Sequence, residues 1–164
     1  MKSKTAGAAY KAARGNLLAM LILTAVNTLL ALTGSDRYYL FTDFAAYIWT
    51  VFARGFYDFT GEAKWLVLGA AGAVLVMAVY FLCWLLSKKR RGWLTAALVL
   101  FIVDTVALVV ITFALYDSPM GKLVDFLLHI WAIVELVLAV RGSRKLKELP
   151  PTEEPRNVCT GPEF

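Results

Sequence analysis

The stretch KLVDFLLHIWAIVELVLAVRG, residues 122–142, decides the fold class of this chain. Apart from Asp125, His129 and Glu135, every residue between Leu123 and Val140 is apolar. A helix needs about 20 mostly apolar residues to cross the hydrocarbon core of a bilayer. The stretch therefore predicts a membrane-spanning helix. Ionisable side chains inside such a helix are costly, so we expect these three to face the interior of a bundle.

Three further stretches have the same character, and Asp104 is the only charged residue in them. They cover residues 16–33, 65–87 and 93–116, and the span described above covers 120–140. Lipid offers no partner for backbone polar groups, so helices are the expected solution. With 60% hydrophobic residues in the whole chain, we predict an all-α membrane protein. Residues 1–142 form its single domain, an antiparallel bundle of four transmembrane helices. The polar, Pro-rich residues 143–164 form a disordered cytoplasmic tail.

The basic residues predict the orientation of the bundle. Thirteen of the 17 Lys and Arg residues precede the first span, separate the second from the third, or follow the fourth. The positive-inside rule then predicts a multi-pass protein of the cell membrane with both termini in the cytoplasm. The run KKRR, residues 88–91, is the strongest orientation signal, and an anionic-lipid site there is an alternative. Basic residues that flank spans do not form a nucleic-acid surface, so the bilayer is the expected partner.

The first span and the loop after it each leave two interpretations open. A basic start also suits a signal peptide, but the apolar run is long and LALTGSD, residues 30–36, is a poor cleavage site, so we expect a retained helix.

The loop of residues 34–64 carries ten aromatic residues between Tyr38 and Phe59. Helical spacing, with a cap at Thr42, predicts a short interfacial helix over 42–54 in this outer loop. Such a helix is either an aromatic belt or a lid.

The small residues of the second span predict close packing of two helices. Gly69 and Ala73 in GAAGA lie four residues apart and share one helix face. Small residues allow helix backbones to approach each other closely in lipid. We expect this face to pack inside the bundle, and a dimer interface is the alternative.

Polar side chains lie at matching depths on different spans. Asn27, Asp104 and His129 are each about 16–18 Å from the cytoplasmic ends of their helices. The turn DSPMGK, residues 117–122, makes the third and fourth spans neighbours, so contact between Asp104 and His129 is available. Asp125 shares the face of His129 one turn away. We expect one polar layer of Asn27, Asp104, Asp125 and His129, and a second layer of Glu135 with Tyr80.

The polar cluster has three interpretations. It is a hydrogen-bonded pin that holds the helices together, a proton or ion site, or a metal or catalytic site. One histidine without a supporting motif makes a metal site a weak hypothesis, and a bis-His haem site is excluded because no second histidine exists. The chain contains no G-x-S-x-G, P-loop or HExxH motif. We therefore expect no cofactor and lean against an enzyme.

Two segments resemble a set of uncharacterised small four-span membrane proteins of Gram-positive bacteria. They are ARGNLLAMLILTAVNTLLALTGSDRYYLF, residues 13–41, and VDFLLHIW with RKLKELP, residues 124–131 and 144–150. The resemblance implies no function. From the residues we expect a non-enzymatic accessory or interaction protein of the cell envelope, with a membrane-protein partner or a second copy of itself. The alternative is a proton- or ion-coupled transporter or channel subunit. A membrane enzyme that acts on a lipid or quinone is a weaker third.

Overall fold

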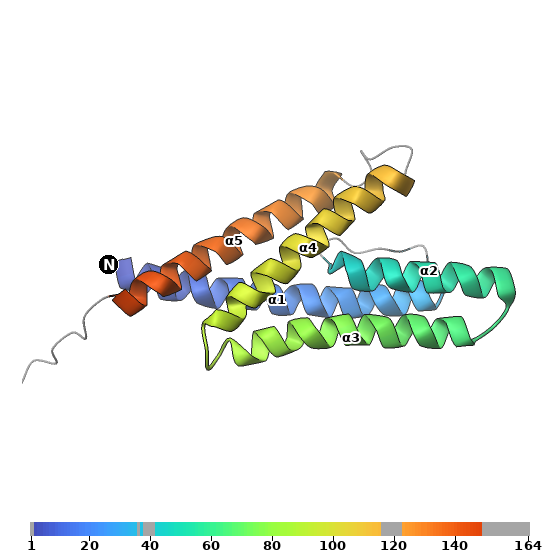
Figure 1. Ribbon diagram of the computed structural model, residues 1–164, viewed down its shortest axis with the longest axis horizontal. Coiled ribbons are helices and arrows are strands. Elements are labelled where there is room, and N and C mark those ends of the chain that lie inside the picture. The colour runs from blue at the N-terminus through green and yellow to red at the C-terminus, as the bar shows by residue number, and fades with distance from the viewer. Residues whose placement is uncertain (1, 36, 38–41, 116–122, 149–164) are drawn as a thin grey trace, which may run out of the picture.

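The computed structural model describes residues 2–35, 37, 42–115 and 123–148, and the described chain is helical (Figure 1). The described residues form five helices, which are α1 Lys2–Leu32, α2 Phe44–Thr60, α3 Lys64–Leu86, α4 Gly92–Leu115 and α5 Leu123–Glu148. The described residues contain no strand.

Four of these helices are long and apolar enough to cross a membrane. The qualifying stretches are Gly7–Leu32, Lys64–Leu86, Gly92–Ala114 and Leu123–Arg144. They match the four spans expected from the sequence, so the prediction of an all-α membrane protein is confirmed. The first and last helices are longer than expected, because α1 begins at Lys2 and α5 continues to Glu148. The turn expected at 117–122 and the tail from 149 onward lie outside the described residues.

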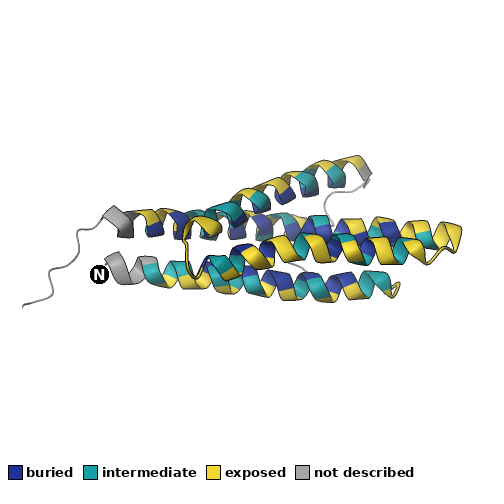
Figure 2. Ribbon diagram, turned by 60° about the horizontal axis from the view of Figure 1, so that its bottom comes forward, coloured by how far each residue is buried: buried dark blue, intermediate teal, exposed yellow. Residues whose placement is uncertain are grey.

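The start of α1, the α3–α4 connection and the end of α5 lie at the same end of the molecule (Figure 1). We call this the basic end, because the KKRR run lies in the α3–α4 connection. The α2–α3 connection lies at the opposite end, which we call the far end (Figure 1). Exposed residues follow the outer faces of the helices and buried residues follow the inner faces (Figure 2). This pattern suits a bundle whose outer faces meet lipid.

Local chemistry explains where α1 and α2 end at the far end. Gly34 adopts a left-handed φ of 74°, and the amides of Gly34 and Ser35 donate to the carbonyls of Ala31 and Leu30. This pair of bonds is a Schellman motif that terminates α1. Gly61, with a φ of 72°, ends α2 by donating to the Tyr57 carbonyl at 2.7 Å. Both glycines occupy a conformation that other residues adopt only with strain.

Helix α2 packs lengthwise against α3, and the two helices run antiparallel. The indole N–H of Trp49 donates to the Leu68 carbonyl at 3.1 Å. A Cβ atom placed on Gly69 would lie 2.5 Å from the Cβ of Ala53, so the two backbones are in close contact there. At the far end, Arg54 donates to the Leu32 carbonyl at 2.9 Å. The small residues of α3 therefore pack inside the bundle, against α2.

The position of α2 differs from the sequence-based expectation. We expected a helix over 42–54 lying flat in the outer interface, whereas α2 covers 44–60 and its first residues, Phe44 and Ala46, are buried in the bundle. The physical reason is that Gly69 and Gly72 of α3 leave room for the side chains of Ala53 and Trp49 of α2, which favours lengthwise contact over a flat position. Helix α2 therefore begins beside Thr24, about two turns before the end of α1.

Two apolar clusters lie along the bundle with polar side chains between them. The larger cluster includes Met20 of α1 and Phe101 of α4, and the smaller one consists of Phe44, Ile48 and Leu108. On α4, Asp104 falls between Phe101 and Leu108, and it is the thirteenth of the 24 residues of that helix. The N-terminus of α2 thus meets the polar layer about halfway along α4.

Candidate functional site

The candidate site is built around the first backbone amides of α2. A helix start leaves its first N–H groups without partners inside the helix, and burial makes unpaired N–H groups costly. Asp104 of α4 accepts from two of them, with Phe44 N at 3.0 Å from Oδ2 and Ala45 N at 2.7 Å from Oδ1. A carboxylate also suits the positive end of the helix dipole. Asp104 therefore anchors the start of α2 to α4.

Asp43 caps the same helix from its own side. Its Oδ1 atom accepts from Ala45 N at 3.1 Å and from Ala46 N at 3.4 Å. Its backbone amide donates to Oγ1 of Thr24 on α1 at 2.8 Å. Every amide from Asp43 to Ala46 thus has a partner, which is how a helix can begin among buried side chains.

His129 of α5 lies beside Asp104. Its Nε2 atom is 3.5 Å from Oδ2 of Asp104, so the contact expected between these two residues is present. Its Nδ1 atom is 2.8 Å from the backbone oxygen of Asp125, and its ring stacks on Phe101 with centroids 5.0 Å apart. The side chains of His129 and Asp104 are 1% and 3% exposed, so water does not screen their interaction.

These contacts restrict where protons reside. A carbonyl oxygen only accepts, so Nδ1 of His129 carries a hydrogen and donates it to Asp125. Nε2 then either bears a second hydrogen, which makes the ring a cation, or presents a lone pair toward Asp104. A lone pair facing an ionised carboxylate is repulsive. The His129–Asp104 pair therefore needs a proton on one of its two facing atoms.

Asp43 adds a second carboxyl group to the same site. The carboxyl groups of Asp43 and Asp104 both accept from the amide of Ala45, so two acidic side chains lie side by side at the start of α2. Burial, followed by the charge of Asp104, raises the pKa of Asp43, which lies outside the four spans in the sequence. Among the described residues, Oδ2 of Asp43 and Nε2 of His129 have no hydrogen-bond partner. We call Asp43, Asp104 and His129 the acid–histidine cluster.

The structure also locates the other four side chains expected at the site, which are Asn27, Tyr80, Asp125 and Glu135. Asn27 and Asp125 are fully buried, on α1 and α5 respectively. Tyr80 of α3 is also buried, and it interacts electrostatically with Asp43 and Asp104, so it lies near Asp104 and not in a layer with Glu135 as expected. Glu135 instead accepts a hydrogen bond from Asn16 of α1. The described residues contain no group of three His, Cys, Asp or Glu that could hold a metal ion.

Sequence reasoning did not assign Asp43 or Thr24 to the site. We expected Thr42 as the cap of the outer-loop helix, but Asp43 is the cap. The Thr24 hydroxyl donates to the Met20 carbonyl of its own helix, and its oxygen also accepts from the Asp43 amide. The signal for Asp43 was its position directly before a helix, where Asp is a strong N-cap.

Comparison with known proteins adds no assignment to this geometry: no family model matches the chain, and neither does any curated protein or solved structure.

Proposed function

We propose that this membrane protein couples the uptake and release of a proton at the acid–histidine cluster to the passage of a proton, ion or solute across the bilayer. The observation that carries the proposal is the arrangement of two carboxyl groups and one imidazole at the start of α2. With Asp104 ionised, and with Asp43 and His129 protonated, the cluster is neutral. Removal of one proton leaves a net negative charge inside the bundle. Burial makes this charge unfavourable, so loss of the proton favours a change of conformation.

A hydrogen-bonded pin that only holds the helices together would explain the bonds of Asp104 but not the presence of Asp43 and His129 beside it. Asp104 by itself would satisfy two amides of α2. The second carboxyl and the imidazole add a proton requirement that a pin does not need. The groups that the described residues place at the cluster are Thr24 of α1, which does not titrate, Tyr80 of α3, and Asp125 of α5 through its backbone oxygen. His129 is the side chain among them that can carry a positive charge.

The orientation follows from the charges. We place the basic end in the cytoplasm of a cell whose plasma membrane holds the protein, as the positive-inside rule predicts. The start of α2 then lies near the middle of the bilayer, because Asp104 is about 18 Å from the start of α4. A re-entrant helix with a buried N-terminus is tolerated at this depth only where protein surrounds it.

The first experiment uses the single histidine of the chain. Protein labelled with ¹⁵N-histidine and reconstituted in liposomes reports on His129 alone. We expect the neutral ring to carry its hydrogen on Nδ1, where the Asp125 carbonyl accepts it, and spectra recorded between pH 5 and 8 show whether the ring takes up a second proton. The same liposomes, loaded with a pH-sensitive dye, should show a proton flux when a pH gradient is applied.

The matched variants separate a proton site from a pin. His129→Gln keeps a polar side chain but cannot titrate, so we expect the flux to fall to the level of empty liposomes while the helical content is unchanged. Glu62→Gln, an exposed change at the far end, should leave the flux unaltered. A histidine that keeps one charge state across this pH range, with no flux in the unaltered protein, would contradict the proposal.

An accessory role remains the second candidate, and the exposed aromatic face of α2 favours it. The side chains of Trp49, Phe52, Phe56 and Phe59 recur at helical spacing and are 45–89% exposed. Four large rings on one helix suit contact with a membrane-protein partner as well as with lipid. Gentle extraction that yields only the single chain, with no copurifying protein, would count against this role.

A further inference from the structure

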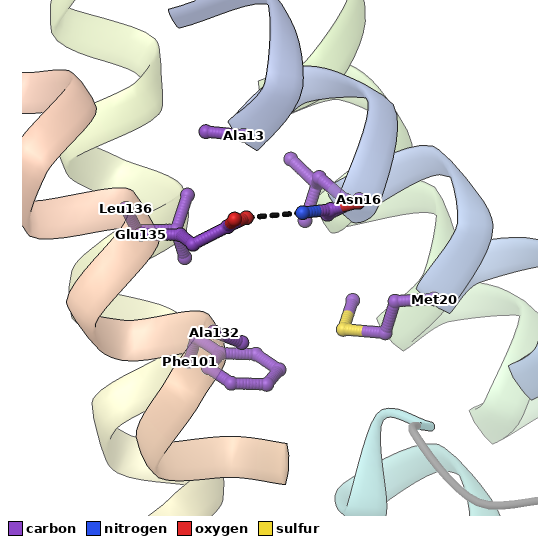
Figure 3. A pocket seen from close by; sticks show the side chains of 8 residues that line it. Ala13, Asn16, Met20, Phe101, Ala132, Glu135 and Leu136 are labelled. Carbon is purple, nitrogen blue, oxygen red and sulfur yellow. Dashed lines mark hydrogen bonds between the residues drawn. The ribbon is translucent and has the colours of Figure 1, made fainter. Parts of the chain in front are cut away.

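A small cavity lies between α1, α4 and α5, on the basic-end side of the acid–histidine cluster. It measures about 10 Å³, the lower limit of the space that one water molecule needs. Figure 3 shows Glu135 of α5 and Asn16 of α1 pointing toward each other across it, with the amide of Asn16 donating to the carboxylate. Of the eight residues that line the cavity, Glu135 is the only titratable one.

The inner wall of this cavity borders the cluster directly. Phe101 lines the cavity and also stacks on the ring of His129. Met20 lines the cavity too, and its carbonyl accepts from Thr24, which binds the amide of Asp43. Phe101 therefore contacts both the space around Glu135 and the imidazole of His129, and the backbone of Met20 connects the cavity wall to Asp43 through Thr24.

We propose that Glu135 is the proton relay between the basic end and the acid–histidine cluster, with Phe101 as the barrier between them; this rests on the function proposed above. Glu135 is six residues from His129, a rise of about 9 Å along α5, too far for direct transfer. A proton leaves the carboxylic acid of Glu135 through water in the cavity and reaches Nε2 of His129 when the Phe101 ring moves aside. Glu135 then regains a proton from water at the basic end.

The surroundings of Glu135 suit this role. It is half-buried, so it contacts both the cavity and the outside of the bundle. The other helices that line the cavity present Asn16 of α1 and Phe101 of α4, and neither titrates. Arg14, the nearest cation along α1, is engaged with Ser87 and Trp84 of α3.

The test measures how fast His129 exchanges its proton, separately from where it titrates. In Glu135→Gln the amide still bonds to Asn16, but the side chain no longer carries a proton. We expect exchange at the ¹⁵N-labelled His129 and the proton flux to slow by roughly tenfold or more, since a positioned proton donor contributes at least that much. The midpoint of the His129 titration should stay unchanged. Glu135→Asp should restore part of the rate.

A second variant tests the barrier. Phe101→Ala removes the ring between the cavity and His129, so exchange at His129 should become faster than in the unaltered protein. Phe113→Ala is the matched control, because Phe113 lies on the same helix and is 69% exposed. Normal titration and flux in the unaltered protein, with an unchanged exchange rate in Glu135→Gln, would overturn the relay and leave the proposed function intact. A His129 that does not titrate would overturn both.

Discussion

At the scale of single residues, Asp104 has the most demanding position in the molecule. It accepts from two amides of α2 and also faces His129. Three separate elements therefore depend on one carboxylate, and its removal should disturb each of them. Because its neighbours are buried, no water replaces the lost interactions.

We predict that Asp104→Asn destabilises the protein by about 2–3 kcal/mol, because the amide group has one acceptor oxygen where the carboxylate had two and its N–H₂ faces other donors. Unfolding by SDS in mixed detergent micelles measures this difference. Asp58→Asn is the control, since Asp58 pairs with Arg54 at an exposed position of α2. It should cost no more than about 0.5 kcal/mol. Equal effects of the two changes would contradict the anchoring role of Asp104.

At the scale of elements, the contact between α2 and α3 holds α2 in its lengthwise position. Glycine is required at residue 69 by the closeness of the two helices, since an added Cβ would lie 2.5 Å from that of Ala53. Gly55, on the exposed side of α2, has open space around it. The two glycines therefore support opposite predictions for the same substitution.

Gly69→Ala should destabilise the protein by about 1–3 kcal/mol, because α2 must shift away from α3. Gly55→Ala should stabilise it by about 0.5–1 kcal/mol, because alanine is the better helix former. Thermal unfolding followed by tryptophan fluorescence measures both. A tolerated Gly69→Ala would mean that α2 and α3 are not in close contact.

At the scale of the whole molecule, the five helices make a bundle in which one helix begins in the interior. The far-end half of α2 contacts the end of α1, through Arg54, and the start of α3, through the stacking of Phe56 on Trp65. Its first residues instead contact the middle of α1 and α4. This difference in depth between the two ends of α2 is directly measurable.

Cysteine labelling should show that the two ends of α2 differ in accessibility. In a background with Cys83→Ala and Cys159→Ser, we expect Ala45→Cys to resist a membrane-impermeant maleimide and Phe59→Cys to react with it. The cause is that Phe59 is 89% exposed whereas the amide of Ala45 is held by Asp104. A helix lying flat in the interface would expose both positions equally.

The same reagent tests the orientation. In sealed cells, Glu62→Cys at the far end should be labelled from outside, and Lys88→Cys at the basic end should be labelled only after permeabilisation. Both residues are exposed, so a failure to react is not due to burial. The opposite pattern would place the basic end outside the cell and contradict the positive-inside assignment.

The sequence by itself determined the number of spans and the matching depths of Asp104 and His129. These features follow from local length and hydropathy, and depth along a helix follows from counting residues. Only the tertiary structure decided that α2 turns inward, that Asp43 joins Asp104 at its first amides, and that Glu135 meets Asn16. The physical reason is that the fit between small side chains and the pairing of buried amides depend on which helix faces which. Composition does not encode that choice.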